Sequence, residues 1–199
     1  RLGLCDHLAS GLRVDRRPDS AIHRRLSALR DEPIDPALAL AGLLCDGGVD
    51  AAKDVCRALR LSNRLTETVV WLVRSLPMLR HESDLELADL KILMAEPNWP
   101  QLLELLRTDL AAADADQGPY LSVLQRAEAI DPADVAPPPL LSGDDLAALG
   151  LPPGPRFGEI LKNVYRAQLN ERITTHERAR ELAERLAAKS EAFKLIYKL

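Results

Sequence analysis

Helix-starting and helix-stopping residues recur along this chain and divide it into short segments. Asp35-Pro36 joins a capping carboxylate to a proline at the first helical position, ahead of the apolar run "ALALAGLLCD". Ser62 opens a segment with apolar residues at helical spacing, which Pro77 is expected to stop, and Ser83-x-x-Glu86 has the spacing of a capping box. No useful length of sequence alternates with a period of two. The pattern predicts an all-α protein of roughly ten short helices.

Composition favours the same fold class. The chain has 199 residues, of which 47% are apolar and only 4% aromatic, so Leu and Ala must fill most of the core. No apolar run approaches the roughly 18 to 20 residues that cross a bilayer, and no secretory signal is visible. Cys5, Cys45 and Cys56 have apolar or helical flanks and form no C-x-x-C pair. We therefore expect buried, reduced thiols in a cytoplasmic protein with no membrane partner.

A proline-rich stretch, "DPADVAPPP" at 131–139, predicts a linker between two domains, because consecutive prolines favour extended backbone. It separates a helical body, 1–130, from a smaller helical tail, 140–199. In the tail, Ser142 is a fitting helix cap and Gly150 suits the left-handed position that ends a helix. Pro155 opens the next helix, and Thr174-x-x-Glu177 has capping-box spacing. The tail is therefore expected to be three helices joined by tight corners.

Charge is distributed unevenly along the sequence. The net charge is -4, yet residues 31–155 hold nine basic and twenty-one acidic residues. Residues 1–30 have seven Arg against three Asp, and residues 156–199 have ten Lys or Arg against six Glu. Basic ends on an acidic body fit nucleic-acid contacts at the ends. They fit equally well with pairing inside the molecule and ordinary solvated faces.

Few residues point to catalysis or to a bound metal. No phosphate-binding glycine loop occurs, and the four histidines, His7, His23, His81 and His176, share no ligand spacing. "ALALAGLLCDGG" resembles the helix of HD-type metal phosphohydrolases, in which a histidine and the aspartate after it bind metal. Cys45 stands here in place of that histidine, ahead of Asp46. Because hard-metal phosphoester chemistry prefers His and carboxylate ligands, we assign no catalytic and no metal-binding residue.

The tail carries a more specific motif. "PPLLSGDDLAALGLPPGPRFGEILKNVYRAQLNERITTHERARELA" resembles the C-terminal tail of the bacterial class II tRNA nucleotidyltransferase and poly(A) polymerase family, which includes the CCA-adding enzymes. The match covers about 45 residues, with its spacing intact. Weaker similarities lie upstream in "LRLSNRLTETVVWLV" and "PNWPQLLELLRTD". The paired carboxylates of the family's catalytic head have no counterpart in this sequence.

The resemblance implies the body and tail of such an enzyme, which hold tRNA so that its 3′ end reaches a catalytic head absent from this chain. The expected partners are tRNA or another structured RNA and the protein's own head domain. This chain needs no cofactor, whereas magnesium with CTP or ATP is implied for the head. Used alone, the chain is expected to transfer no nucleotide. Whether the parent protein adds CCA or poly(A) stays open.

Basic residues of the tail are the candidate RNA contacts, because they combine local positive charge with helix starts inside the resembling motif. The alternative is that Glu159, Glu171 and Glu181 already neutralise them. Two other functions stay open, a helical protein-interaction domain whose RNA role has lapsed and an HD-type metal phosphohydrolase. The predicted RNA-binding residues are Arg156, Lys162, Arg166, Arg172 and Arg178.

Overall fold

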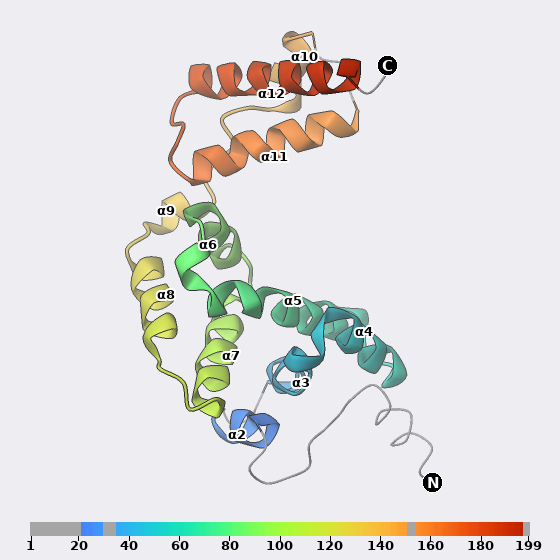
Figure 1. Cartoon of the computed structure of the whole chain (residues 1–199), viewed down its shortest axis with the longest axis vertical. Coiled ribbons are helices and arrows are strands. Elements are labelled where there is room, and N and C mark those ends of the chain that lie inside the picture. Colours follow the sequence, from blue (N-terminus) through green and yellow to red (C-terminus); the bar gives the residue numbers. More distant parts are fainter. Residues whose placement is uncertain (1–20, 30–34, 151–153, 197–199) are drawn as a thin grey trace. The chain divides into compact units, whose positions relative to one another are not determined.

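The structure is a computed structural model that describes residues 21–29, 35–150 and 154–196. Over these residues it is helical and has no strand, which confirms the all-α prediction (Figure 1). The helices pack into two units, and each is described by itself below. Within the described part of the chain, no helix is both long and apolar enough to cross a membrane.

The first unit, called here the body unit, has α5 (Asn63–Arg80) as its central helix. α5 packs against α3, α4, α7 and α8, and α2 packs against α3 and α7. Leucine and valine side chains fill the core, as the low aromatic content predicts; Leu72, Leu76 and Leu105 are fully buried. The other elements of this unit are α2 (Ala21–Ser27), α3 (Pro36–Leu44), η1 (Cys45–Gly47), α4 (Gly48–Ala58), η2 (Glu82–Asp84), α7 (Trp99–Ala112) and α8 (Gly118–Glu128).

Local capping signals set where several of these helices begin. The Asp35 carboxylate accepts hydrogen bonds from two backbone N–H groups at the start of α3, and the Ser62 hydroxyl accepts one from Leu65 N. The expectation that Pro77 stops α5 is wrong, because the helix continues through it to Arg80. A proline inside a helix costs about 3 kcal/mol. Burial of Leu76 and Leu79 on either side of Pro77 offsets that cost.

The second unit, called here the C-terminal unit, is discontinuous in sequence. It joins α6 (Leu87–Met94) to residues from 130 onward, although α6 lies between α5 and α7 along the chain. α6 packs against α9 and α11. The later elements are α9 (Pro132–Val135), α10 (Gly143–Ala148), α11 (Pro155–Leu169) and α12 (His176–Ile196) (Figure 1).

The expected capping box of Ser83 and Glu86 is not formed. Residues 82–84 make a 3-10 turn, and α6 begins only at Leu87, after a cap residue, Glu86, that makes no side-chain cap bond. The Glu86 carboxylate instead accepts hydrogen bonds from Arg166 and Asn170. A long-range ionic contact therefore replaces the local one that the spacing predicts.

The three tail helices have the corners that the sequence predicts. Ser142 and Asp145 form a complete capping box at the start of α10, and their hydrogen bonds lower the pKa of Asp145 to about 2. Gly150 has a φ of 75°, the left-handed value that glycine tolerates best. At the start of α12 the hydroxyl that accepts a backbone bond belongs to Thr175, one residue after the expected Thr174.

Residues 131–139, predicted as a linker, are part of the C-terminal unit. They include the short helix α9, and the carbonyl groups of Pro137 and Pro138 accept hydrogen bonds from Tyr165 and Gln168 of α11. The domain limits 1–130 and 140–199 stay a prediction. The structure also shows that α6 packs in one unit with the helices that follow residue 130.

We expect the Leu146→Ala substitution to destabilise the C-terminal unit by about 2–5 kcal/mol, because the Leu146 side chain is 0% exposed and lies in the core of this unit. Chemical unfolding followed by circular dichroism measures the change. The matched control is Ile92→Ala in α6, where the side chain is 39% exposed and its loss should cost clearly less. Equal effects of the two substitutions would contradict the assigned core.

Candidate functional site

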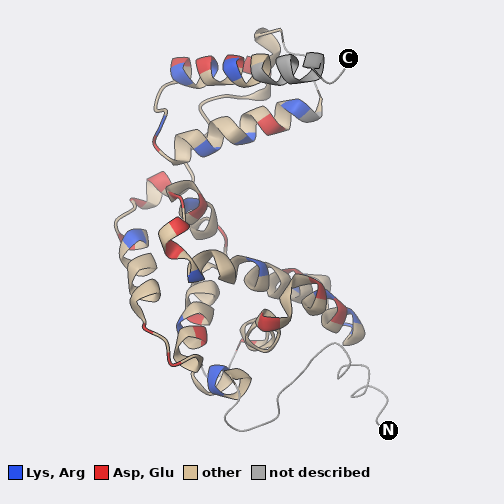
Figure 2. Ribbon diagram, viewed as in Figure 1, with Lys and Arg blue, Asp and Glu red and all other residues tan. Residues whose placement is uncertain are grey.

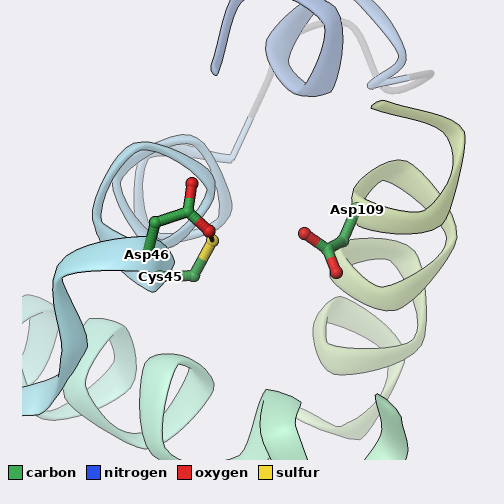
Figure 3. A group of neighbouring side chains, drawn as sticks. All are labelled: Cys45, Asp46 and Asp109. Atoms are coloured by element: carbon green, nitrogen blue, oxygen red, sulfur yellow. Dashed lines mark hydrogen bonds between the residues drawn. The ribbon is translucent and has the colours of Figure 1, made fainter. Parts of the chain in front are cut away.

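Three potential metal ligands meet inside the body unit. Cys45 and Asp46 follow the last turn of α3, and Asp109 faces them from α7 (Figure 3). One ligand atom from each residue lies within 4.8 Å of the other two. Cys45 and Asp109 are buried, whereas Asp46 is exposed. This is the segment that resembles an HD-type helix, and the fold adds a second carboxylate to it from 63 residues further along the chain.

Two arginines already bind these carboxylates. Arg25 of α2, which is 4% exposed, donates to Asp109 Oδ1 at 2.7 Å and to both oxygens of Asp46 at 3.2 Å. It also donates to the carbonyl oxygen of Gly42 at 2.7 Å. Arg80, the last residue of α5, makes a fork on Asp109 with bonds of 2.7 and 2.8 Å. The guanidinium of Arg25 therefore supplies the positive charge that a metal ion would bring to this group.

Protonation in this cluster works against metal binding. Burial raises the pKa of the Cys45 thiol to about 11, although the charge of Arg25 opposes the rise. The thiol is therefore neutral at pH 7, while a metal ligand must be the thiolate. Burial also tends to raise the pKa of Asp109, but hydrogen bonds and charge from Arg80 and Arg25 outweigh it and hold that pKa below its ordinary value. The cluster is thus a set of ion pairs around an ionised carboxylate.

Two of the five predicted RNA-binding residues hold the C-terminal unit together. Arg166 of α11 makes a fork on Asp89 at 2.6 and 3.0 Å and also contacts Glu86 at 3.0 Å. Arg172 donates to the same Glu86 at 3.2 Å. The hydrogen bond from Asn170, with those from Arg166, lowers the pKa of Glu86. Glu86, the cap residue of α6, and Asp89 of α6 therefore neutralise these two arginines, and not the Glu159, Glu171 and Glu181 that sequence spacing suggested.

The other three predicted RNA-binding residues make fewer contacts within the C-terminal unit. Arg156 donates one bond, to the carbonyl oxygen of Ala187 in α12. Lys162 on α11 and Arg178 in the first turn of α12 are exposed, and their side chains have no ionic partner in the described part of the chain. Charged residues of both signs lie along α11 and α12 (Figure 2). The structure therefore brings Arg166 and Arg172 together at Glu86, whereas the side chains of Lys162 and Arg178 are exposed to solvent.

Sequence reasoning missed Arg25, Arg80 and Asp109 as a group. A signal for Asp109 was present, because it has helical spacing from Leu102, Leu105 and Ala112, which are buried in α7. A charged residue on the apolar face of a helix needs a buried partner. Which arginine supplies it could not be read from the sequence, since Arg25 is 84 residues away.

Comparison with known proteins finds similarity to tRNA nucleotidyltransferases. A sequence profile described as tRNA nucleotidyltransferase domain 2 matches residues 35–181. The CC-adding tRNA nucleotidyltransferase of Thermus thermophilus is 30% identical over 175 residues, which cover 82% of this chain and 40% of that protein. The A-adding tRNA nucleotidyltransferase of Deinococcus radiodurans is 37% identical over 99 residues, which cover 44% of this chain and 22% of that protein.

A further A-adding tRNA nucleotidyltransferase, from Geobacter sulfurreducens, is 47% identical over 47 residues, covering 24% of this chain and 5% of that protein. The chain thus spans less than half the length of each of these curated relatives. No solved structure matches the chain at a significant level.

We expect Asp109→Asn to destabilise the body unit by about 3–5 kcal/mol, because it leaves Arg25 buried without its main counter-charge. The folded-state pKa of Asp109 is depressed, so its contribution is present above pH 4 and is lost as the pH falls below that value. Urea unfolding of both proteins between pH 7 and pH 3 measures this. A stability difference that stays constant over the whole range would contradict the ionised state of Asp109.

We also expect protein purified without chelator to hold no stoichiometric manganese, nickel, iron or zinc. The reason is that Arg25 already neutralises the carboxylates of Asp46 and Asp109 and that the Cys45 thiol is protonated. Elemental analysis measures the metal content, and Arg25→Ala, which uncovers the three ligands, is the comparison. Stoichiometric metal in the unsubstituted chain would show that the arginine does not block the site.

Proposed function

Since this chain belongs to the tRNA nucleotidyltransferase domain 2 family, we propose that it is the part of a tRNA nucleotidyltransferase that holds the RNA and positions its 3′ end for a catalytic head. The observation that carries the proposal is the profile match over residues 35–181, which includes helices of both units. Contacts of this kind recognise RNA through its shape and phosphates. The tail motif read from the sequence supports the same role.

The names of the relatives support a more specific proposal for the reaction of the whole protein. They are CC-adding and A-adding tRNA nucleotidyltransferases, so we place the parent protein in the building of the tRNA 3′ end, and not in poly(A) addition. Magnesium with CTP or ATP belongs to the catalytic head in this proposal. A tRNA substrate and reduced cysteines agree with a cytoplasmic location. Cys45 and Cys56 are buried free thiols, while Cys5 lies outside the described residues.

Contacts inside the C-terminal unit divide its basic residues into two roles. Arg166 and Arg172 position α11 against α6, because their guanidinium groups are bound to Glu86 and Asp89. Lys162 and Arg178 are exposed and carry unneutralised charge, so they are our choice for phosphate contacts. Arg156 donates one hydrogen bond to α12, and its other N–H groups are available for RNA in this proposal. The five residues predicted from sequence thus fall into RNA contacts and residues that position them.

Two other functions have less support. A protein-interaction domain needs no RNA affinity, and the acidic excess of residues 31–155 would suit it. A metal phosphohydrolase needs an open metal site, whereas the carboxylates of Asp46 and Asp109 are bound by Arg25. RNA binding by the chain therefore separates the proposal from both.

We expect the chain to bind tRNA, and a Lys162→Glu, Arg178→Glu double variant to bind it more weakly with no loss of stability. Each lost phosphate contact should reduce the log-log salt slope by about 0.7–0.9. Fluorescence anisotropy with a labelled tRNA that lacks its 3′ CCA measures both quantities.

Arg166→Gln is the matched control, because Arg166 is bound to Asp89 and Glu86. It should lower the stability of the C-terminal unit and change the salt slope little once the protein is folded. Absence of tRNA binding by the unsubstituted chain would favour the protein-interaction domain. Equal binding by the double variant at every salt concentration would remove Lys162 and Arg178 from the interface.

A further inference from the structure

The solvent side of α5 carries an unusual set of residues. Val69, Leu72, Val73 and Leu76 are buried and turn one side of the helix toward the core. The opposite side, called here the α5 stripe, repeats at three- and four-residue spacing. Each residue of the α5 stripe is exposed or partly buried, and Met78 is 38% exposed. The α5 stripe consists of Arg64, Glu67, Trp71, Arg74 and Met78.

In the described part of the body unit, the arginines whose side chains have no partner lie on α5 or just before it. Elsewhere in the described part of the body unit each arginine donates to a carboxylate or a backbone carbonyl; these residues are Arg24, Arg25, Arg57, Arg80, Arg107 and Arg126. Arg64 and Arg74 of the α5 stripe, and Arg60 just before the helix, are exposed, and their side chains have no hydrogen-bond or ionic partner among the described residues. Residues 31–155 have far more acidic than basic residues. Unpaired arginines in so acidic a region fit a partner that brings its own negative charge.

An aromatic ring lies between the two arginines of the stripe. Trp71 is half-buried and follows Arg64 by seven residues, two turns along the same side of α5. Arg74 is three residues further on, the spacing at which helix side chains are neighbours. The ten-residue offset from Arg64 to Arg74 corresponds to a rise of about 15 Å, which a few nucleotides can span. Arginines around a ring that solvent can reach are a common arrangement for binding unpaired nucleotides, with phosphates on the cations and a base on the ring.

We propose that the α5 stripe binds unpaired nucleotides of the RNA, with a base stacked on Trp71 and phosphates held by Arg64 and Arg74. This rests on the proposed function and adds a surface of the body unit that the sequence analysis did not assign. The single acidic member, Glu67, lies between the cations and opposes the phosphate contacts. The surface is open to solvent, so binding needs no rearrangement of the core.

The test uses the full chain, fluorescein-labelled tRNA lacking its 3′ CCA and a labelled twelve-nucleotide single strand. Trp71 and Trp99 are the two tryptophans of the chain, so Trp99→Phe leaves Trp71 as the sole tryptophan reporter. RNA should quench its emission. Trp71→Leu should weaken binding about 5- to 150-fold, while Trp71→Phe, which keeps a ring, should retain most of the affinity. Arg64→Gln with Arg74→Gln should reduce the salt slope by about 1.4–1.8.

Two control variants distinguish the loss of an RNA contact from a general effect of substitution. Arg57→Gln removes an arginine that is paired with Asp54, so it should leave affinity unchanged. Glu67→Gln should raise affinity. If the chain binds tRNA but Trp71→Leu and the double arginine variant bind it equally well, the α5 stripe is not an RNA surface and the proposed function stands. If no RNA binds the chain at all, both proposals fail, and the unpaired arginines then belong to a protein partner.

Discussion

The carboxylate of Asp109 accepts hydrogen bonds from two arginines that come from well-separated parts of the body sequence. Arg25 belongs to α2 and Arg80 ends α5, while Arg25 also reaches Asp46 after α3. Four helical segments therefore meet at one buried ion-pair group. Because charges inside a protein interact strongly and tolerate no missing partner, this group fixes the relative positions of those segments. The leucine core buries the apolar surface of this unit, and the ion pairs join the four segments at one place.

Ion pairs also join separate segments in the C-terminal unit, where most of the paired side chains are partly exposed. Glu86, which caps α6, and Asp89 of α6 bind Arg166. Lys91, which is 3% exposed, pairs with Glu171 at 2.9 Å. Basic residues that sequence spacing does not distinguish therefore have different roles in the structure. Those facing a carboxylate on another helix hold the fold, and those without a partner stay free for a ligand. The proposed RNA contacts, Lys162 in this unit and Arg74 in the body unit, were chosen by that criterion.

How much the sequence predicted depended on the range of the interaction. Signals that act within four residues were predicted well, such as the capping groups of Asp35, Ser62 and Ser142 and the left-handed Gly150. The expectations for Pro77 and for the capping box at Ser83 were wrong, because core burial and a contact with Arg166 override the local preference. The partners of Asp109 and of Arg166 lie 29 to 84 residues away, and no local pattern encodes them. The family resemblance was found because its proline and glycine spacing is itself local.

The placement of α6 has a consequence for synthesis of the chain on the ribosome. About 60 residues separate the end of α6 from the start of α11, the helix that binds its charged side. At ribosomal speeds that interval lasts about 3 to 12 seconds. During that interval the leucines of α6 lack the neighbours that bury them in the folded unit, and Glu86, Asp89 and Lys91 lack their ionic partners. Charged residues next to an apolar segment disfavour its association with other apolar segments, so these charges suit α6 both before and after α11 has been made.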